Sequence, residues 1–438
     1  MTLSYLSIVR LGLVQMALGS IVVLTTSTLN RLMIVELAMA AVIPGLLVAF
    51  HYGIQITRPN WGFRSDRGGS RTPWIIGGMA TLAVGGILAA AGVIVMEDRY
   101  TLGLVISILA YALIGLGVGA SGTSLLALLA KATDPRRRAA AATITWLMMI
   151  AGIAITAGVV GSLLDPYSPT LLLTLVSAVA GLAVAVTCLA TWGIERRAAA
   201  VLTRPSAPSE AQVRFIDGFV EIWAERKARH FTIFVFLSMT AYFMQELILE
   251  PYAGIVFQMT PGQSTSLSGA QNGGVFIGML TVGIAATGLG LGSLRTWVIA
   301  GCFGSSAALI AIAALGQMPE PNATWLQGAV IALGFANGIF AVAAIGAMMR
   351  LAGEGRAQRE GTRMGLWGAA QAIAAGFGGL VGAAGADIMR VLIGQDAPAF
   401  ATVFTLEAAL FVASAVMAAS IMSARYQQQS ETALVPGE

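Results

Sequence analysis

The stretch that decides the fold is residues 62–73, Gly-Phe-Arg-Ser-Asp-Arg-Gly-Gly-Ser-Arg-Thr-Pro, a short basic turn between two long apolar runs. A connection this short makes the two runs antiparallel neighbours. The arginines place the turn on the cytoplasmic side of a membrane, where Lys and Arg accumulate. Within it we single out a loop motif of Gly62, Asp66, Arg67 and Arg71: the glycines allow positive φ, and Asp66 can cap a helix or pair with an arginine.

The composition excludes an ordinary soluble protein. Hydrophobic residues make up 57% of the 438 residues and charged residues only 11%, against about 25% charged in soluble domains. We therefore expect an integral membrane protein, whose 52 glycines let helices pack closely in lipid. Cys188 and Cys302 lie inside apolar runs and indicate neither a disulfide framework nor thiol chemistry. The basic residues lie in loops without a patch suited to nucleic acid, and no phosphate-binding Gly-x-x-x-x-Gly-Lys loop occurs.

Twelve apolar runs are long enough to cross a bilayer, which requires about 20 residues. We expect them near residues 11–29, 33–57, 73–96, 100–130, 139–164, 169–193, 231–258, 267–291, 297–315, 325–349, 364–389 and 399–423. Of the 25 Lys and Arg, all but Arg31, Arg99 and Arg390 then fall on one face, which is therefore cytoplasmic. The predicted fold is all-α integral membrane, with twelve transmembrane helices in two pseudo-symmetric six-helix bundles and both termini cytoplasmic.

The longest loop divides the spans six and six. We predict an N-terminal bundle over residues 1–193, a cytoplasmic linker over 194–230, a C-terminal bundle over 231–423 and a cytoplasmic tail over 424–438. The similar segments Arg71-Thr-Pro-Trp and Arg295-Thr-Trp-Val open spans three and nine, which supports a duplicated unit.

The linker is expected to contain an amphipathic helix. Apolar residues recur there at helical spacing among charged ones, at Val213, Ile216, Phe219, Val220 and Trp223. Such a helix lies on the membrane surface, where it either covers the underside of the bundle or docks a partner.

Acidic residues inside spans are the first candidates for function, because an ionised carboxylate in lipid costs at least about 2.5 kcal/mol. Glu36 is expected to begin span two, next to Arg31 in the preceding loop, and Glu407 lies in span twelve. Glu246 and Glu250 are expected one helical turn apart on one face of span seven. We predict a periplasmic polar cluster in which Arg31 pairs with Glu36 or Glu250 and helps hold the two halves together. The alternative is that each carboxylate merely reaches the lipid headgroups.

Three segments of the chain resemble one known family. They are Ser27-Thr-Leu-Asn-Arg-Leu-Met-Ile-Val-Glu-Leu, the loop of residues 58–73, and Phe231-Thr-Ile-Phe-Val-Phe-Leu-Ser-Met running into Leu249-Glu-Pro-Tyr-Ala-Gly. They look like the PucC/LhaA family, the bacteriochlorophyll-delivery branch of the major facilitator superfamily, whose loop between spans two and three has the pattern Gly-x-x-x-Asp-Arg-x-Gly. One departure is Ala253, where Gly would be expected.

The resemblance implies a major facilitator fold and a non-enzymatic assembly factor for light-harvesting or reaction-centre antenna complexes. Such a factor would bind bacteriochlorophyll as cargo and deliver it to nascent antenna polypeptides in the bacterial inner, photosynthetic intracytoplasmic membrane. The implied partners are membrane lipid and antenna polypeptides or the reaction-centre core, with bacteriochlorophyll synthase as a further candidate.

A pigment cargo would need an apolar, aromatic wall and an axial ligand for its Mg. His51 is the one histidine expected inside a span, flanked by Phe50 and Tyr52, and neutral imidazole binds metals well. The alternative is a structural histidine that is hydrogen-bonded to a neighbouring helix. Asn30, Gln245 and Asn337 can also ligate Mg through their carbonyls. No metal site made by the protein alone is expected.

A transporter and an enzyme are the two alternative functions. A proton-coupled transporter or flippase for a small hydrophobic compound would use Glu246, Glu250 or Glu407 to take up the proton. A pigment prenyltransferase would need Mg held by paired aspartates, whereas the aspartates of this chain are isolated. We therefore expect no enzymatic activity.

Overall fold

The computed structural model describes residues 3–58, 61, 70–134, 137–196, 223, 225–353 and 360–421. Regular structure within these residues is entirely helical, in the order α1 (Tyr5–Val23), η1 (Leu24–Thr28), α2 (Leu29–Arg31), η2 (Leu32–Glu36), α3 (Val42–Ile54), η3 (Gln55–Thr57), α5 (Thr72–Asp98), α6 (Tyr100–Ala132), α7 (Arg138–Leu163), α8 (Pro169–Thr191), α11 (Arg226–Met244), η5 (Gln245–Leu247), α12 (Leu249–Val256), α13 (Pro261–Val282), η6 (Gly283–Gly288), α14 (Leu294–Leu315), α15 (Ala323–Gly353), α16 (Glu360–Ile393) and α17 (Asp396–Ile421). Gly62, Asp66 and Arg67 of the loop motif, and the predicted amphipathic helix apart from Trp223, lie outside the described residues.

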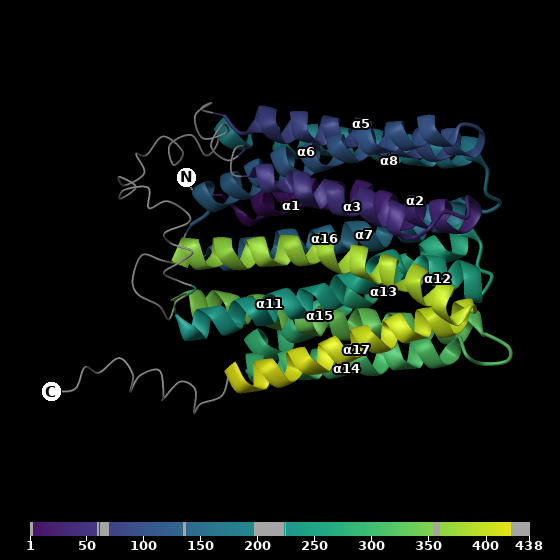
Figure 1. Cartoon of the computed structure of the whole chain (residues 1–438). Helices are drawn as coiled ribbons and strands as arrows, with labels where there is room; N and C mark the ends of the chain where they lie inside the picture. Colours follow the sequence, from purple (N-terminus) through teal and green to yellow (C-terminus); the bar gives the residue numbers. More distant parts are fainter. Residues whose placement is uncertain are drawn as a thin grey trace.

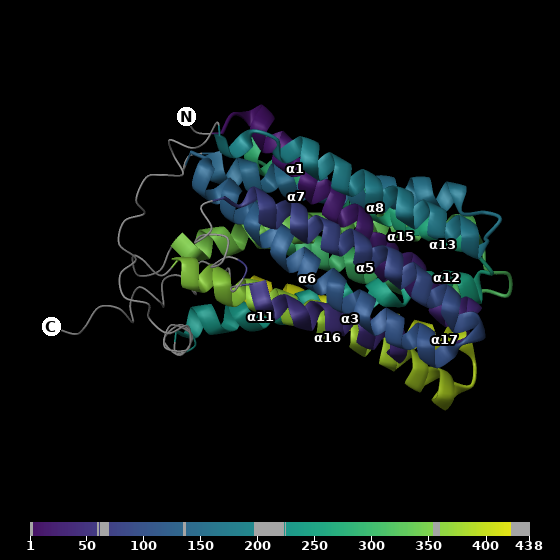
Figure 2. The same ribbon diagram turned by 90° about the horizontal axis from the view of Figure 1, so that it is seen from above.

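The described residues contain eleven helical stretches long and apolar enough to cross a membrane, together with the shorter apolar helix Val42–Thr57. They lie side by side in one elongated bundle, as two views at right angles show (Figure 1, Figure 2). The all-helical membrane fold predicted from the sequence is confirmed. The bundle end at which α1 begins and α17 ends is called the terminal end here, and the opposite end is called the distal end.

Each half of the chain buries its own apolar core. Helices α1 to α8 enclose one core, in which Leu11, Leu82 and Leu125 are fully buried. Helices α11 to α17 enclose the other, centred on Phe234, Phe340 and Phe411. Figure 1 shows the first half, purple to blue, above the second half, green to yellow, so the contact surface between halves runs along the length of the bundle.

The sequence placed the boundary between the first two spans wrongly. Residues Tyr5–Glu36 form one continuous helical stretch, and α3 starts only at Val42. The predicted break rested on Arg31 as a loop residue, but its side chain is 2% exposed and hydrogen-bonded within the bundle. The chain reverses after η2 instead, where Ala38 adopts a φ of 50°. Glu36 therefore ends span one and does not begin span two.

Span seven is also different from the prediction, because it is broken. Helix α11 ends at Met244, a tight turn covers Gln245–Leu247, and α12 begins at Leu249. Pro251 fits in the first turn of α12, since the N–H groups there have no partner within the helix. Glu246 thus lies in the turn and Glu250 in α12, so the single regular helix predicted to carry both residues is interrupted between them.

Glycines allow the helices to approach closely. A Cβ at Gly269 of α13 would lie 2.7 Å from the backbone N of Gly158 in α7, across the boundary between the halves. Within the second half, a Cβ at Gly278 would lie 2.1 Å from the carbonyl oxygen of Phe335. These helices pack backbone to backbone, as small residues permit in lipid.

Candidate functional site

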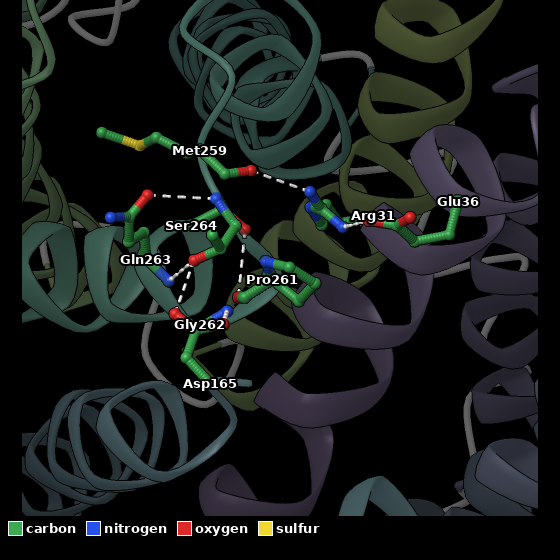
Figure 3. A network of polar contacts seen from close by, with 9 residues as sticks. Arg31, Glu36, Asp165, Met259, Pro261, Gly262, Gln263 and Ser264 are labelled. Atoms are coloured by element: carbon green, nitrogen blue, oxygen red, sulfur yellow. Dashed lines mark hydrogen bonds and ion pairs between the residues drawn. The ribbon is translucent and has the colours of Figure 1, made fainter. Parts of the chain in front are cut away.

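Arg31 is the centre of a polar junction between the halves. Its Nη1 lies 2.5 Å from Glu36 Oε1, and its Nη2 donates a 2.9 Å hydrogen bond to the carbonyl of Met259 in the second half (Figure 3). The guanidinium also lies against α12, because a Cβ at Gly254 would be 3.2 Å from Nη2. Of the two carboxylates considered as partners for Arg31, Glu36 is the one that forms the ion pair.

Further hydrogen bonds join the halves at the distal end. Asp387 of α16 accepts from the backbone N–H groups of Ala41 and Val42 at 3.0 and 2.8 Å, which caps the start of α3. Asp165, which follows α7, accepts from Thr260 Oγ1 at 2.5 Å and from the N–H of Gly262 at 3.2 Å, which caps α13 (Figure 3). The carboxylates occupy helix N-termini, where the helix dipole favours negative charge. These contacts hold the two halves together at the distal end.

A second group of contacts runs inward from this end along the first span. Asn30 Nδ2 donates to the carbonyl of Leu247 at 2.8 Å, in the break of span seven. The hydroxyls of Thr28 and Thr265 are 3.2 Å apart, and those of Ser27 and Ser268 are 3.4 Å apart. Hydroxyl pairs thus connect α1 and its extension to α13 between the distal end and the centre.

A cavity of about 80 Å³ lies at the centre, below these contacts. Its walls come from both halves and combine polar with aliphatic side chains: Val22, Val23, Thr26, Ser27, Ile153, Tyr242, Gln245, Glu246, Leu249, Ser268, Gln271, Asn272 and Val275. The volume corresponds to two or three water molecules at about 30 Å³ each, and it is well below the roughly 300–1,000 Å³ of ordinary ligand pockets. The centre is thus partly polar but narrow.

Two carboxylates occur at this centre. Glu246 lines the cavity, and Thr26 lies within hydrogen-bonding reach of it. Glu250 is not among the residues that line the cavity, but it is 1% exposed, and its Oε1 accepts at 2.5 Å from the hydroxyl of Ser268, which does line the cavity. Glu407, the third predicted acid, is fully buried in α17 and is not among the residues that line the cavity.

His51 is buried in α3 and also lies outside the lining of the cavity. Its Nδ1 is 2.8 Å from the carbonyl of Val48, so Nδ1 carries the proton and Nε2 keeps the lone pair. The rings of His51 and Tyr52 lie together, with centroids 4.2 Å apart, whereas Phe50 is exposed on the outside of the bundle. The ring of His51 also lies 6.5 Å from that of Tyr111, and the ring of Tyr52 lies 6.2 Å from that of Phe243. Phe50 is therefore separate from the two buried rings.

The described end of the loop motif packs against α8. Arg71 is buried at the N-cap of α5, and its backbone N–H donates to Glu195 at 2.6 Å. Glu195 also accepts from the hydroxyl of Thr72 at 2.8 Å and from that of Ser70. This carboxylate, which follows α8, caps α5 at the terminal end and was not expected from the sequence.

The remaining predicted amides, Asn337 and Gln245, lie in different surroundings. Asn337 accepts from Ser305 Oγ at 2.7 Å inside the second half, whereas Gln245 lines the central cavity. Sequence reasoning missed Asp165 and Asp387, since a contact across the halves leaves no local pattern. The start of α13, by contrast, has a local sequence pattern. In Thr260-Pro-Gly-Gln the Thr and Gln form a capping box, which predicts a helix N-terminus.

Comparison with known proteins places the chain in a family. The family model described as PUCC protein matches residues 28–426. The chain belongs to the PUCC protein family. The chain is 64% identical over 425 residues to the bacteriochlorophyll synthase 44.5 kDa chain of Rhodobacter capsulatus, with 97% of each chain covered. It is 32% identical over 445 residues to Protein PucC of Cereibacter sphaeroides, covering 95% of this chain and 92% of that one.

Solved structures establish the fold of this PUCC family protein. The nucleoside transporter NupG aligns with a TM-score of 0.66 at 14% identity, over 96% of this chain and 100% of that one. A bacterial homologue of the human drug peptide transporters PepT1 and PepT2 aligns with a TM-score of 0.69 at 14% identity, over 97% and 99%. The chain has the major facilitator fold predicted from the sequence. At such low identity, the likeness carries no information about substrate.

Proposed function

We propose that this PUCC family protein is a non-enzymatic assembly factor that binds bacteriochlorophyll and hands it to nascent antenna polypeptides of light-harvesting or reaction-centre complexes. The family and the names of its relatives indicate a role in the biosynthesis of photosynthetic complexes. The observation that carries the proposal is the 64% identity, over nearly the whole chain, to a protein named as a bacteriochlorophyll synthase chain.

The word synthase in that name raises the question of catalysis. Joining a prenyl diphosphate to a pigment would need Mg held by several carboxylates. The described residues contain no group of three or more His, Cys, Asp or Glu that is suited to hold a metal ion, and the aspartates of the full sequence are isolated. We therefore propose that this chain is a partner of a bacteriochlorophyll synthase and receives the pigment from it.

The cavity limits where a pigment can bind. A volume of about 80 Å³ cannot hold a tetrapyrrole, since even ordinary ligands need roughly 300 Å³ or more. In the described conformation the central cavity therefore does not hold the cargo, and we place the cargo against the lipid-facing surface, where Phe50 is 43% exposed. His51 Nε2 remains a candidate axial ligand for Mg only if α3 and α6 separate, because the imidazole is buried and its ring lies 6.5 Å from that of Tyr111 in α6.

Co-purification with matched variants tests this proposal. The tagged full chain is purified from a host that makes bacteriochlorophyll, and the pigment is quantified from its absorption spectrum. We expect bound pigment together with antenna polypeptides. His51→Phe should lower the pigment content only if the ring ligates Mg, and Phe50→Ala should lower it if the cargo binds on the outer face. Colourless protein without antenna polypeptides would refute the proposal.

The charge pattern supports a location in the bacterial inner membrane. Arg10, Arg226 and Arg295 lie at the terminal end of the bundle, whereas Arg31, Arg99 and Arg390 lie at the distal end. Because Lys and Arg accumulate on the cytoplasmic side, we assign the terminal end to the cytoplasm. A reporter fused to the C-terminus that is active only in the cytoplasm should be active, and an inactive reporter would reverse the orientation.

One observation favours a second function, a proton-coupled transporter or flippase for a small hydrophobic compound. The central cavity is partly polar, lies between the halves and contains Glu246. Uptake into proteoliposomes that depends on a pH gradient and is lost in Glu246→Gln would support this function. Absence of uptake by the wild-type protein across a panel of candidate compounds would exclude it.

A further inference from the structure

The centre of the bundle contains two carboxylates, Glu246 and Glu250, and the side chains around them supply too little positive charge to balance them. Glu246 lines the cavity, and Glu250 follows it by one turn of chain. Glu250 Oε1 accepts from Ser268, while Oε2 is buried without a hydrogen-bond partner among the described residues. A buried carboxylate oxygen without a donor is costly, so this atom indicates a missing partner.

An independent feature points into the same space. Gln245 is only 2% exposed and lines the cavity, and its Oε1 has no hydrogen-bond partner in the described part of the chain. The hydroxyls of Ser27 and Ser268 line the cavity as well. The unpartnered atoms are thus a neutral carbonyl oxygen and a carboxylate oxygen, which are the ligands that hard cations take in proteins.

The surrounding groups offer too little positive charge. Arg31 is close enough to Glu250 for a Coulombic interaction, but it is already paired with Glu36 and bonded to the Met259 carbonyl. Tyr52 and Tyr242, which face Glu246, are uncharged in their protonated form. The walls from the first span, α7 and α13 contribute hydroxyls, amides and aliphatic groups without charge.

Two carboxylates that share a site of low dielectric do not both remain ionised without a counter-charge. We infer that Glu246 and Glu250 share one monovalent cation, a proton or a sodium ion, with the oxygens of Gln245, Ser27 and Ser268 completing its shell. The cavity of about 80 Å³ holds a small ion with one or two waters and excludes organic cations.

The site lies where the halves meet, so its charge state affects their contact. Ser27 and Ser268, 3.4 Å apart, belong to opposite halves, and Ser268 is also the donor to Glu250. Loss of the cation doubles the net negative charge of the carboxylate pair beside this contact and weakens the contact. The inference does not rest on the proposed function, because it holds for any cargo.

The test uses the purified full chain in detergent at constant ionic strength. Thermal unfolding is compared in sodium chloride and in N-methylglucamine chloride, and infrared spectra are recorded for the C=O stretch of protonated carboxyls. The variants are Glu246→Gln and Glu250→Gln. Glu407→Gln is the matched control, because it removes a fully buried carboxylate that neither lines the cavity nor accepts a hydrogen bond from a described residue that lines it.

A sodium site predicts a sodium-dependent rise in Tm that is abolished in Glu250→Gln and retained in Glu407→Gln. A proton site predicts no sodium response, but a protonated-carboxyl band that Glu246→Gln or Glu250→Gln removes. Should either variant fail to fold, Ser268→Ala keeps both carboxylates and should shift the band or weaken the sodium response. Wild-type protein that shows neither the sodium response nor such a band would overturn the inference.

Discussion

Arg31 offers the sharpest test of how the two halves are held together. Replacing it by Met keeps an unbranched side chain of similar length against Gly254, so the change removes mainly the polar contacts. Two contacts are lost: the ion pair with Glu36 at 2.5 Å and the hydrogen bond to the Met259 carbonyl at 2.9 Å.

The two contacts differ in expected strength. The Glu36 side chain is 43% exposed, and pairs with such access to solvent contribute about 0–1 kcal/mol. The hydrogen bond from a buried charged donor to Met259 contributes about 1.5–3 kcal/mol. Arg31→Met should therefore lower the unfolding free energy by about 2–4 kcal/mol, whereas Glu36→Gln should lower it by at most about 1 kcal/mol.

Two assays measure the effect. Unfolding by SDS in mixed micelles gives the free energies, and a cysteine pair replacing Thr28 and Thr265, whose hydroxyls are 3.2 Å apart, reports on the contact between the halves. Arg31→Met should slow formation of this disulfide, and Glu36→Gln should leave it unchanged. Equal loss of stability in the two variants would show that the ion pair, and not the bond across the halves, is what stabilises this junction.

Two further predictions concern helix packing and capping. Gly278→Ala should destabilise the protein by about 1–3 kcal/mol, because the new Cβ would lie 2.1 Å from the Phe335 carbonyl oxygen. Gly273→Ala, on the same helix with nothing within 4 Å of the added Cβ, should be neutral in the same SDS titration, and similar losses would contradict the packing argument. Asp387→Ala should cost about 2 kcal/mol, since two backbone N–H groups at the start of α3 lose their acceptor. Asp396→Ala removes a pair that is partly exposed on both sides and should cost less than about 1 kcal/mol; the reverse order would refute the capping role.

The spans themselves could be predicted from the sequence because lipid requires about 20 apolar residues for each crossing. The ends of the first two spans could not. The sequence alone does not distinguish an arginine buried in a span, such as Arg31, from an arginine in a loop. Only the tertiary contacts of Arg31 with Glu36 and Met259 show that it is buried. The break of span seven had a local signal in Pro251, which favours the first turn of a new helix.

The site was predictable residue by residue but not as an arrangement. Arg31, Glu246 and Glu250 were expected near the junction because charge is rare in spans. The capping by Asp165 and Asp387 depends on helices from opposite halves meeting at one end, and a single sequence does not encode that distance in any local pattern. The narrow cavity likewise follows from how helices of both halves pack at the centre, and no local sequence pattern encodes its volume.

The proposed role of this protein is to hand bacteriochlorophyll to antenna polypeptides. Pigment transfer between purified components measures this role: the protein isolated with its pigment is mixed in lipid vesicles with pigment-free antenna polypeptides, and absorption follows the pigment. We expect the spectrum to change to that of assembled antenna faster than with free pigment alone. Transfer no faster than with free pigment, from protein that carries pigment, would contradict delivery.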